Sequence, residues 1–179
     1  MIQGEDVRID SNTVFKHPDF VELGNHVAID CGFYCTTKLK VGDYVHISPY
    51  CTVIGGKNAF FEMCHFSGLA AGCRIVCATD ECLGEGIPNP TIPAKYRDKV
   101  ICKPVKLEMF ATLATNVVVV PGVTIREGTL VGANSFVNKD TEPWTVYVGS
   151  PAKPIKERRR DVILAYAKEL GYLSEPEAT

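Results

Sequence analysis

Apolar residues recur at every sixth position along two stretches of the chain. The first series is Leu23, Ile29, Cys35, Val41, Ile47 and Val53, and the second is Leu107, Leu113, Val119, Ile125, Val131 and Val137. A period of six matches neither an amphipathic helix, with its period of 3.6, nor an alternating strand, with its period of 2. It is typical of a solenoid in which each group of six residues forms one strand and one turn. Three such groups would complete a triangular coil of about 18 residues, with the apolar anchor pointing inward.

The period is interrupted between the two series. The register slips by about one residue near Lys57 to Phe60, and from 79 to 103 the period disappears. Pro88, Pro90 and Pro93 lie in this second segment, and such a proline density excludes the interiors of strand ladders and helices. We therefore expect segment 79–103 to leave the solenoid as an external loop. Loops of this length are usually functional or disordered, and we favour a functional loop because Ile87, Ile92 and Tyr96 give it apolar side chains to pack.

The repeat ends after Asp140, and the pattern near the C-terminus is helical. From Pro154 to Leu173 the apolar residues fall on one broad stripe with basic residues outside it. We expect an all-β solenoid domain over 1–153, followed by a short C-terminal α-helix and tail over 154–179. The helix would cap the open end of the solenoid or pack on a neighbouring subunit.

Composition narrows the function classes. The formal net charge is −2, so nothing suggests a nucleic-acid partner or an anionic membrane. The N-terminal residues lack a signal-peptide pattern, and no apolar run is long enough to insert in a membrane, so we expect a cytoplasmic protein. The eight cysteines include no C-x-x-C pair. We interpret them as reduced, apolar core residues, and we expect no metal site.

Three C-terminal stretches resemble the signature of the hexapeptide-repeat acetyltransferases. They are Val119–Ile125, Val131–Asp140 and Gly149–Lys156. The resemblance implies a left-handed parallel β-helix, a homotrimer with intersubunit active sites, and acetyl-CoA as the acyl donor. Segment 77–93 is similar to the branch associated with polysaccharide biosynthesis. The implied acceptor is a small molecule, a sugar or nucleotide-linked sugar, with O-acetylation favoured over N-acetylation of a nucleotide-linked amino sugar.

The resemblance also implies where coenzyme A binds. Small residues at the edge of the solenoid would let the amide-rich pantetheine arm approach the backbone, and they are Ala114, Thr115 and Ala133. Lys153 and Lys156 match positions where the family places basic residues near the phosphates of the coenzyme. Asn138 matches a position that contacts its adenine or ribose.

The proton acceptor is less clear, because the family histidine in the loop is replaced by Asp80. Asp80 and Glu81 are candidate bases at that place, and His46 and His65 are two further candidates because histidine titrates near neutral pH. The two histidines are nineteen residues apart, about one coil plus the slip, so we expect them to stack on one edge. Candidate acceptor-binding residues are Tyr34, Thr36 and the loop residue Asn89.

Other readings remain open. An amine attacks a thioester with less need of a base, so the missing histidine favours N-acylation, whereas the overall resemblance favours O-acylation. A γ-type carbonic anhydrase shares the fold and would need three histidines around zinc; His26, His46 and His65 lie about one coil apart. A solenoid without catalytic activity, acting as a binding surface, is a third alternative.

Overall fold

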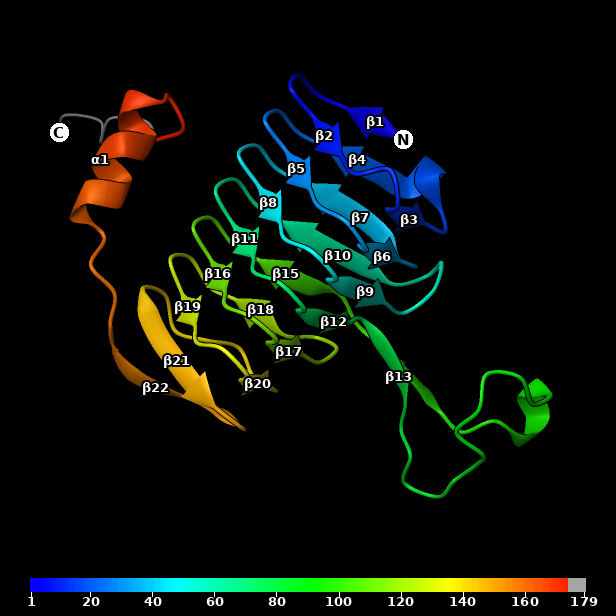
Figure 1. Ribbon diagram of the computed structural model, residues 1–179. Coiled ribbons are helices and arrows are strands. Elements are labelled where there is room, and N and C mark those ends of the chain that lie inside the picture. The colour runs from blue at the N-terminus through cyan, green and yellow to red at the C-terminus, as the bar shows by residue number, and fades with distance from the viewer. Residues whose placement is uncertain (174–179) are drawn as a thin grey trace, which may run out of the picture.

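Three sheets, parallel except for the edge strand β22 (Ala152–Glu157), form the faces of a triangular solenoid in the computed structural model, which describes residues 1–173. The first sheet, sheet A, consists of β1 (Ile2–Gln3), β4 (Val21–Leu23), β7 (Lys38–Val41), β10 (Phe60–Met63), β15 (Val105–Leu107) and β18 (Thr124–Ile125). Sheet B consists of β2 (Arg8–Ile9), β5 (Ala28–Ile29), β8 (His46–Ile47), β11 (Gly68–Leu69), β16 (Thr112–Leu113), β19 (Leu130–Val131), β21 (Thr145–Gly149) and β22 (Ala152–Glu157). Sheet C consists of β3 (Val14–Phe15), β6 (Tyr34–Cys35), β9 (Thr52–Ile54), β12 (Arg74–Val76), β17 (Val118–Val119) and β20 (Phe136–Val137). Figure 1 shows the coils stacked from the N-terminus downward.

The six-residue anchors form the core, as the sequence predicts. All twelve anchors of the two series are buried, and so are the small or β-branched residues four positions after the anchors of the second series. Each strand buries one face against the other two sheets and pairs with the strands of the coils above and below. No coil can bury its apolar face alone, so stacking supplies the stability.

The insertion that shifts the register near Lys57 is longer than the one residue predicted from the sequence. Val21 pairs with Leu39, eighteen residues on, whereas Leu39 pairs with Phe61, twenty-two residues on. The coil thus gains four residues rather than one, and they form a turn around Gly55 and Gly56 between β9 and β10. The expected stacking of the two histidines is wrong for this reason. His46 pairs in register with Gly68, not with His65.

The external loop expected between 79 and 103 is present. It leaves the solenoid through β13 (Ala78–Asp80) and returns through β14 (Val100–Cys102), which pair as an antiparallel ladder. A 3-10 turn, η2 (Ala94–Tyr96), lies near its tip, and a second one, η1 (Pro18–Phe20), precedes β4. Figure 1 shows the loop projecting away from the coils. The prolines lie between β13 and β14, which is why the base of the loop can still form a ladder.

The C-terminal helix is shorter than predicted, and it packs beside the coils rather than over the end of the solenoid. Residues 152–157 form the edge strand β22, antiparallel to β21, and α1 spans only Asp161–Glu169. Proline is tolerated in an edge strand, so Pro154 does not prevent this hairpin. The helix does not cap the open end of the solenoid. It runs back beside the coils (Figure 1), and the tail residues 174–179 lie outside the described part of the chain.

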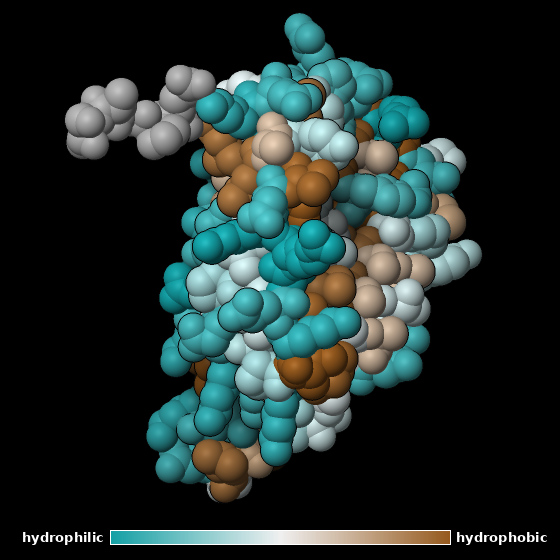
Figure 2. Space-filling view, turned by 90° about the vertical axis from the view of Figure 1, so that its left-hand side faces the viewer, coloured by the Kyte–Doolittle hydropathy of each residue, from teal (hydrophilic) through white to brown (hydrophobic). Residues whose placement is uncertain are grey.

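A stack of rings follows the corner between sheets A and B, and α1 packs on it. We call His26, Tyr44, Phe66, Phe110 and Trp144 the aromatic ladder; successive ring centroids lie 4.6, 5.3, 5.3 and 5.8 Å apart. The inner side of α1 contacts the lower rings. Its outer side exposes Val162, Tyr166 and Leu170, and apolar side chains gather in the upper part of this face of the molecule (Figure 2).

Candidate active site

His46 forms a close pair with a carboxylate on the outer surface of sheet B. Its Nε2 lies 2.8 Å from Oδ2 of Asp30, on the preceding coil. An ionised carboxylate only accepts hydrogen bonds, so the shared proton lies on Nε2 and Nδ1 is the acceptor of the neutral ring. A carboxylate that fixes the orientation and tautomer of a histidine is an arrangement used by general bases.

His65 lies in the turn between β10 and β11, and one of its two ring nitrogens already has a hydrogen-bond partner. Nδ1 accepts the backbone N–H of Asp43 at 2.8 Å, so the proton of the neutral ring lies on Nε2. The ring also packs against Tyr172, with centroids 5.0 Å apart. In this arrangement His65 has no free lone pair, which makes it a poor general base. Its contacts instead connect the middle coil to the segment that follows α1.

Asp43 is the centre of this connection. It accepts the hydroxyl of Tyr172 at 2.7 Å and the backbone N–H of Asn25 at 2.7 Å. Burial raises the pKa of the Asp43 carboxyl, but these hydrogen bonds and the nearby His65 outweigh burial and hold the pKa below its usual value. The hydrogen bond to Asp43 in turn raises the pKa of Tyr172 to about 12.

Tyr172→Phe is expected to destabilise the protein by about 1.5–3 kcal/mol at neutral pH, because it removes one hydrogen bond to a carboxylate. The folded-state pKa of Asp43 is lowered, so its stabilisation is complete above the ordinary value near 3.9 and is lost as the pH falls through the lower folded value. Urea unfolding of both proteins from pH 7 to pH 2 measures this. The wild-type advantage should shrink below about pH 4, and an advantage that persists unchanged at the lowest pH would contradict the assignment.

Three carboxylates gather where the loop leaves the solenoid. Oδ1 of Asp80 lies 3.0 and 3.1 Å from two guanidinium nitrogens of Arg97. Asp98, only 3% exposed, accepts the backbone N–H groups of Cys82 and Lys99 at 2.8 and 2.9 Å. Both side chains therefore hold the two arms of the loop together. Sequence reasoning missed Asp98 because nothing in its local pattern predicts this pairing.

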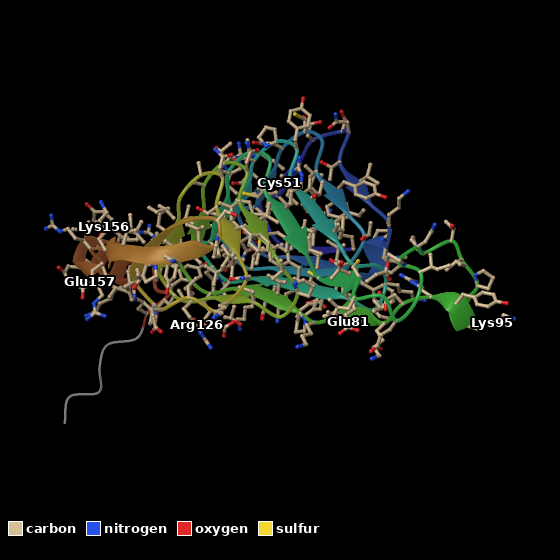
Figure 3. All side chains as sticks on the ribbon, turned by 90° about the horizontal axis from the view of Figure 1, so that it is seen from below. Cys51, Glu81, Lys95, Arg126, Lys156 and Glu157 are labelled. Atoms are coloured by element: carbon tan, nitrogen blue, oxygen red, sulfur yellow. The ribbon has the colours of Figure 1, made fainter. Side chains whose placement is uncertain are left out.

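Glu81 differs from these two carboxylates. Its Oε2 is buried and has no hydrogen-bond partner among the described residues. A buried, unpaired carboxylate oxygen is costly, and such atoms commonly mark a site that a ligand completes. Figure 3 shows Glu81 at the base of the loop and Lys95 toward its far end. Of the two loop acids predicted from the sequence, Glu81 is thus the one with a free acceptor.

The four candidate bases do not converge within one chain. Asp80 and Glu81 lie at the corner between sheets C and A, His65 lies at the corner between sheets A and B, and His46 lies on the outer surface of sheet B. The prism separates these positions. A site that combines a histidine with the loop acids would therefore need residues from two chains.

Three of the six predicted coenzyme residues lie along the corner between sheets B and C. The carbonyl of Thr115 accepts the N–H of Asn134, which stacks Ala133 beside Thr115 on the next coil. The N–H of Ala114 donates to the carbonyl of Val131 on that same next coil. Asn138 follows β20 and lies at the next corner, so it is separated from this strip. The sequence spacing could not show that strand β20 lies between Ala133 and Asn138.

Lys153 and Lys156 lie on the exposed edge strand β22. Figure 3 shows Lys156 and Lys95 at opposite ends of the molecule, so the strand and the loop tip lie far apart. Arg158, just beyond β22, has a different role. It donates from Nη1 to the carbonyls of Phe110 and Gly128, both at 2.9 Å, and so fixes the linker before α1.

The three predicted acceptor-binding residues have local partners and lie apart from one another. Oγ1 of Thr36 accepts the backbone N–H groups of Gly55 and Gly56 at 3.1 and 3.2 Å, which supports the four-residue insertion. Oδ1 of Asn89 accepts the N–H and the hydroxyl of Thr91. The ring of Tyr34 lies 5.7 Å from the ammonium of Lys16. Their binding role stays a prediction.

No three His, Cys, Asp or Glu side chains within residues 1–173 are placed to hold a metal ion. His26, His46 and His65 each pair with a different aspartate instead. Each histidine that the carbonic anhydrase alternative would use thus has an aspartate partner in its own chain. Over the same residues, no helix is long and apolar enough to cross a membrane.

Comparison with known proteins identifies the family. No family model matches the chain. A dTDP-4-amino-4,6-dideoxy-D-glucose acyltransferase of Escherichia coli is 31% identical over 164 residues, which cover 89% of this chain and 83% of that protein. The chain belongs to the hexapeptide-repeat acyltransferases.

Solved structures agree with this assignment. A variant of AntD, an N-acyltransferase from Bacillus cereus, was solved with dTDP-4-amino-4,6-dideoxyglucose and coenzyme A. It is 30% identical, with a TM-score of 0.89, covering 96% of this chain and 90% of AntD. The hexapeptide-repeat acetyltransferase VCA0836 of Vibrio cholerae, 21% identical with a TM-score of 0.63 over 83% of this chain and 81% of its own, shares the fold. The expected preference for O-acetylation is not supported by these relatives, and the amine alternative fits them better.

Proposed function

We propose that this acyltransferase transfers an acyl group from acyl-CoA to the amino group of a dTDP-linked 4-amino-4,6-dideoxy sugar. The observation that carries the proposal is the match to the E. coli dTDP-4-amino-4,6-dideoxy-D-glucose acyltransferase, which extends over 89% of the chain. The likeness to AntD supports it independently. AntD was solved with the same nucleotide sugar, and in another structure with 3-hydroxybutyryl-CoA.

The chemistry of the reaction suits the residues of this chain. A neutral amine attacks the thioester carbonyl, a C–N bond forms, the C–S bond breaks, and coenzyme A leaves as the thiolate. The nitrogen loses one proton, and the thiolate gains one. A neutral amine is already a good nucleophile, so a strong base is dispensable, and the replacement of the family histidine by Asp80 does not prevent the reaction.

The active site would lie between subunits of a homotrimer. His46, oriented by Asp30, has Nδ1 as an acceptor, and Glu81 has an unpaired carboxylate oxygen. The two lie on different sides of one solenoid, and the loop that carries Glu81 projects away from its own coils (Figure 1). In a ring of three chains, the loop of one chain would place Glu81 near His46 of the next. Asp80 and His65 would then act by positioning, through Arg97 and Asp43 respectively.

Acyl-CoA would bind along the strip of Ala114, Thr115 and Ala133. The small side chains leave the backbone accessible to the amides of the pantetheine arm. Lys153 and Lys156 lie on β22, which edges the same sheet B and begins at the corner where the strip lies. Their ammonium groups would bind the phosphates of the coenzyme.

Replacing both Lys153 and Lys156 by glutamine is expected to raise the KM for acyl-CoA about tenfold, because each lysine contributes a charge-assisted contact near the surface. The kcat at saturating acyl-CoA should change little, since neither side chain would touch the reacting atoms. Steady-state kinetics measure both, and the KM for the acceptor serves as the internal control. An unchanged KM for acyl-CoA would remove these lysines from the coenzyme site.

A thiol-release assay tests the proposed function. Purified protein is mixed with acetyl-CoA or 3-hydroxybutyryl-CoA and with dTDP-sugars that carry an amino group or a hydroxyl group at C4. We expect release only with the amino sugar, and we expect the two donors to differ in kcat/KM. Release with the hydroxyl sugars alone would instead establish O-acylation.

A further inference from the structure

The outer surface of sheet A carries a groove that none of the roles above uses. A hollow of about 390 Å³ is lined by Phe60, Glu62, Lys103, Lys106 and Gly122, among others. A neighbouring hollow of about 310 Å³ shares the Phe60 side chain and adds the ring of Phe20, two lysines and two carboxylates; these charged residues are Lys38, Lys40, Asp19 and Glu22. We call the two hollows together the sheet A groove. It combines two aromatic rings with several lysines at the foot of the external loop.

The lysines of this groove are placed by specific contacts. The ammonium of Lys106 lies 3.1 Å from Glu62, and this contact raises the pKa of Lys106. The stem of Lys103 crosses Gly122, where any Cβ would lie 2.9 Å from Cδ of the lysine, and Gly122 has a φ of +87°. No ion pair engages Lys103 within residues 1–173. Two cations and one carboxylate leave this hollow with a positive charge.

The aromatic rings offer a flat surface beside these charges. Phe60 is only partly buried, and it forms the wall between the two hollows. The ammonium of Lys38 lies 5.5 Å from the centroid of the Phe20 ring. Stacking of a base on an aromatic ring, next to lysines that contact phosphates, is a general way to bind nucleotides.

We propose that the sheet A groove binds the nucleoside diphosphate half of the acceptor. The pyrimidine stacks on Phe60, and the diphosphate lies between Lys103 and Lys106. This inference rests on the proposed function, because it gives a place to the dTDP part of that substrate. It also explains why Gly122 stands where a side chain would displace Lys103.

The position of the loop fits this assignment. The N–H of Lys103 bonds to the carbonyl of Cys77, directly before β13. β13 then runs from the edge of the groove to Asp80, three residues on, which is about 10 Å at the usual rise of a strand. A sugar attached to the diphosphate would extend from the groove along this strand. Its amino group would thus come near Glu81, whose Oε2 has no partner among the described residues.

Another hollow, on sheet B, is a poorer place for a diphosphate. It has about 420 Å³ and is lined by Arg8, His26, Asp30 and His46, among others. The two histidines each pair with an aspartate there, Asp6 and Asp30. These carboxylates would repel an anion, so Arg8 provides a matched control cation outside the proposed site.

Calorimetry with dTDP alone tests the groove. The variants are Lys103→Gln, the double variant Lys103→Gln/Lys106→Gln, Phe60→Ala and, as control, Arg8→Gln. We expect the Kd for dTDP to rise about tenfold for Lys103→Gln or Phe60→Ala and at least about thirtyfold for the double variant. The KM for the acceptor should rise in parallel, the KM for acyl-CoA should not change, and Arg8→Gln should bind dTDP like the wild type.

The outcomes separate this inference from the proposed function. If the wild type acylates the dTDP-amino sugar but Lys103→Gln and the double variant bind dTDP unchanged, the groove assignment is wrong and the function stands. If the wild type binds dTDP through these lysines but releases no thiol with the amino sugar, the acceptor is wrong and the groove stands. Wild-type protein that does not bind dTDP overturns the groove. Thermal unfolding of every variant shows whether a loss of binding reflects a loss of folding.

Discussion

Gly128→Ala is expected to lower the free energy of unfolding by about 3–5 kcal/mol, the range seen when a large buried aromatic side chain loses its packing. Gly128 has a φ of +66°, and a Cβ there would lie 2.3 Å from ring atoms of Trp144. Trp144 is only 8% exposed, and it is the last ring of the aromatic ladder, packed next to Phe110. Its displacement would detach the start of β21 from the last coil.

Gly56→Ala is the matched control for this prediction. Gly56 also has a positive φ, +79°, but a Cβ there would meet no atom within 4 Å. Its substitution should cost only the backbone strain of the left-handed conformation, about 1–2 kcal/mol. Urea unfolding of both variants measures the difference. Equal losses would show that the contact of Gly128 with Trp144 adds nothing to backbone strain.

Asp98→Ala is expected to lower kcat/KM about a hundredfold or more while leaving the solenoid folded. The carboxylate of Asp98 holds the backbone of both arms of the loop, at Cys82 and Lys99. Without it, the loop acids would lose their fixed position, and misplacement of reacting groups by about 1 Å can reduce a rate by that factor.

The conservative variant and a neighbour serve as controls for Asp98. Asp98→Asn keeps one acceptor oxygen and should recover part of kcat/KM. Glu85→Gln changes an exposed carboxylate of the same loop that pairs with Lys99, and it should have little effect, as exposed ion pairs usually do. Kinetics are measured together with thermal unfolding. A fall in the unfolding midpoint that matches the fall in activity would mean that Asp98 supports the whole fold rather than the loop alone.

The fold was readable from the sequence because it depends on a local repeat. Each anchor, such as Ile47 or Val119, is buried, and these two pair with Ile29 and Val137, eighteen positions away, so a six-residue period is enough to identify the core. The length of the insertion at Gly55 and Gly56 was harder to predict. A gain of four residues leaves the apolar pattern interpretable in more than one register, and only strand pairing shows which one forms.

The C-terminal elements were predicted less well, since tertiary contacts decide them. Ile155 and its neighbours fit an amphipathic helix, but an open edge of sheet B was available for pairing, and the strand β22 forms there. The bond from Tyr172 to Asp43 connects residues 129 positions apart. No local pattern in the sequence predicts it, and it changes the role of His65.

The candidate site likewise contains some residues that the sequence could place and others that only the folded structure shows. The resemblance placed Ala114, Thr115 and Ala133 on one strip, and the structure brings them together. It could not distinguish Asp80 from Glu81, because adjacent residues differ only through partners that fold next to them. The sheet A groove was missed because Phe60 and Lys103 lie on opposite sides of the long loop in sequence.

The most direct test of the function is a competition between two acceptors. The protein is incubated with acetyl-CoA and equal amounts of dTDP-4-amino-4,6-dideoxyglucose and dTDP-6-deoxyglucose, and the products are identified by mass spectrometry. We expect acetylation of the amino sugar nucleotide alone, on nitrogen, with one equivalent of free coenzyme A released. Acetylation of the neutral sugar nucleotide, with the amino sugar left unmodified, would contradict the account.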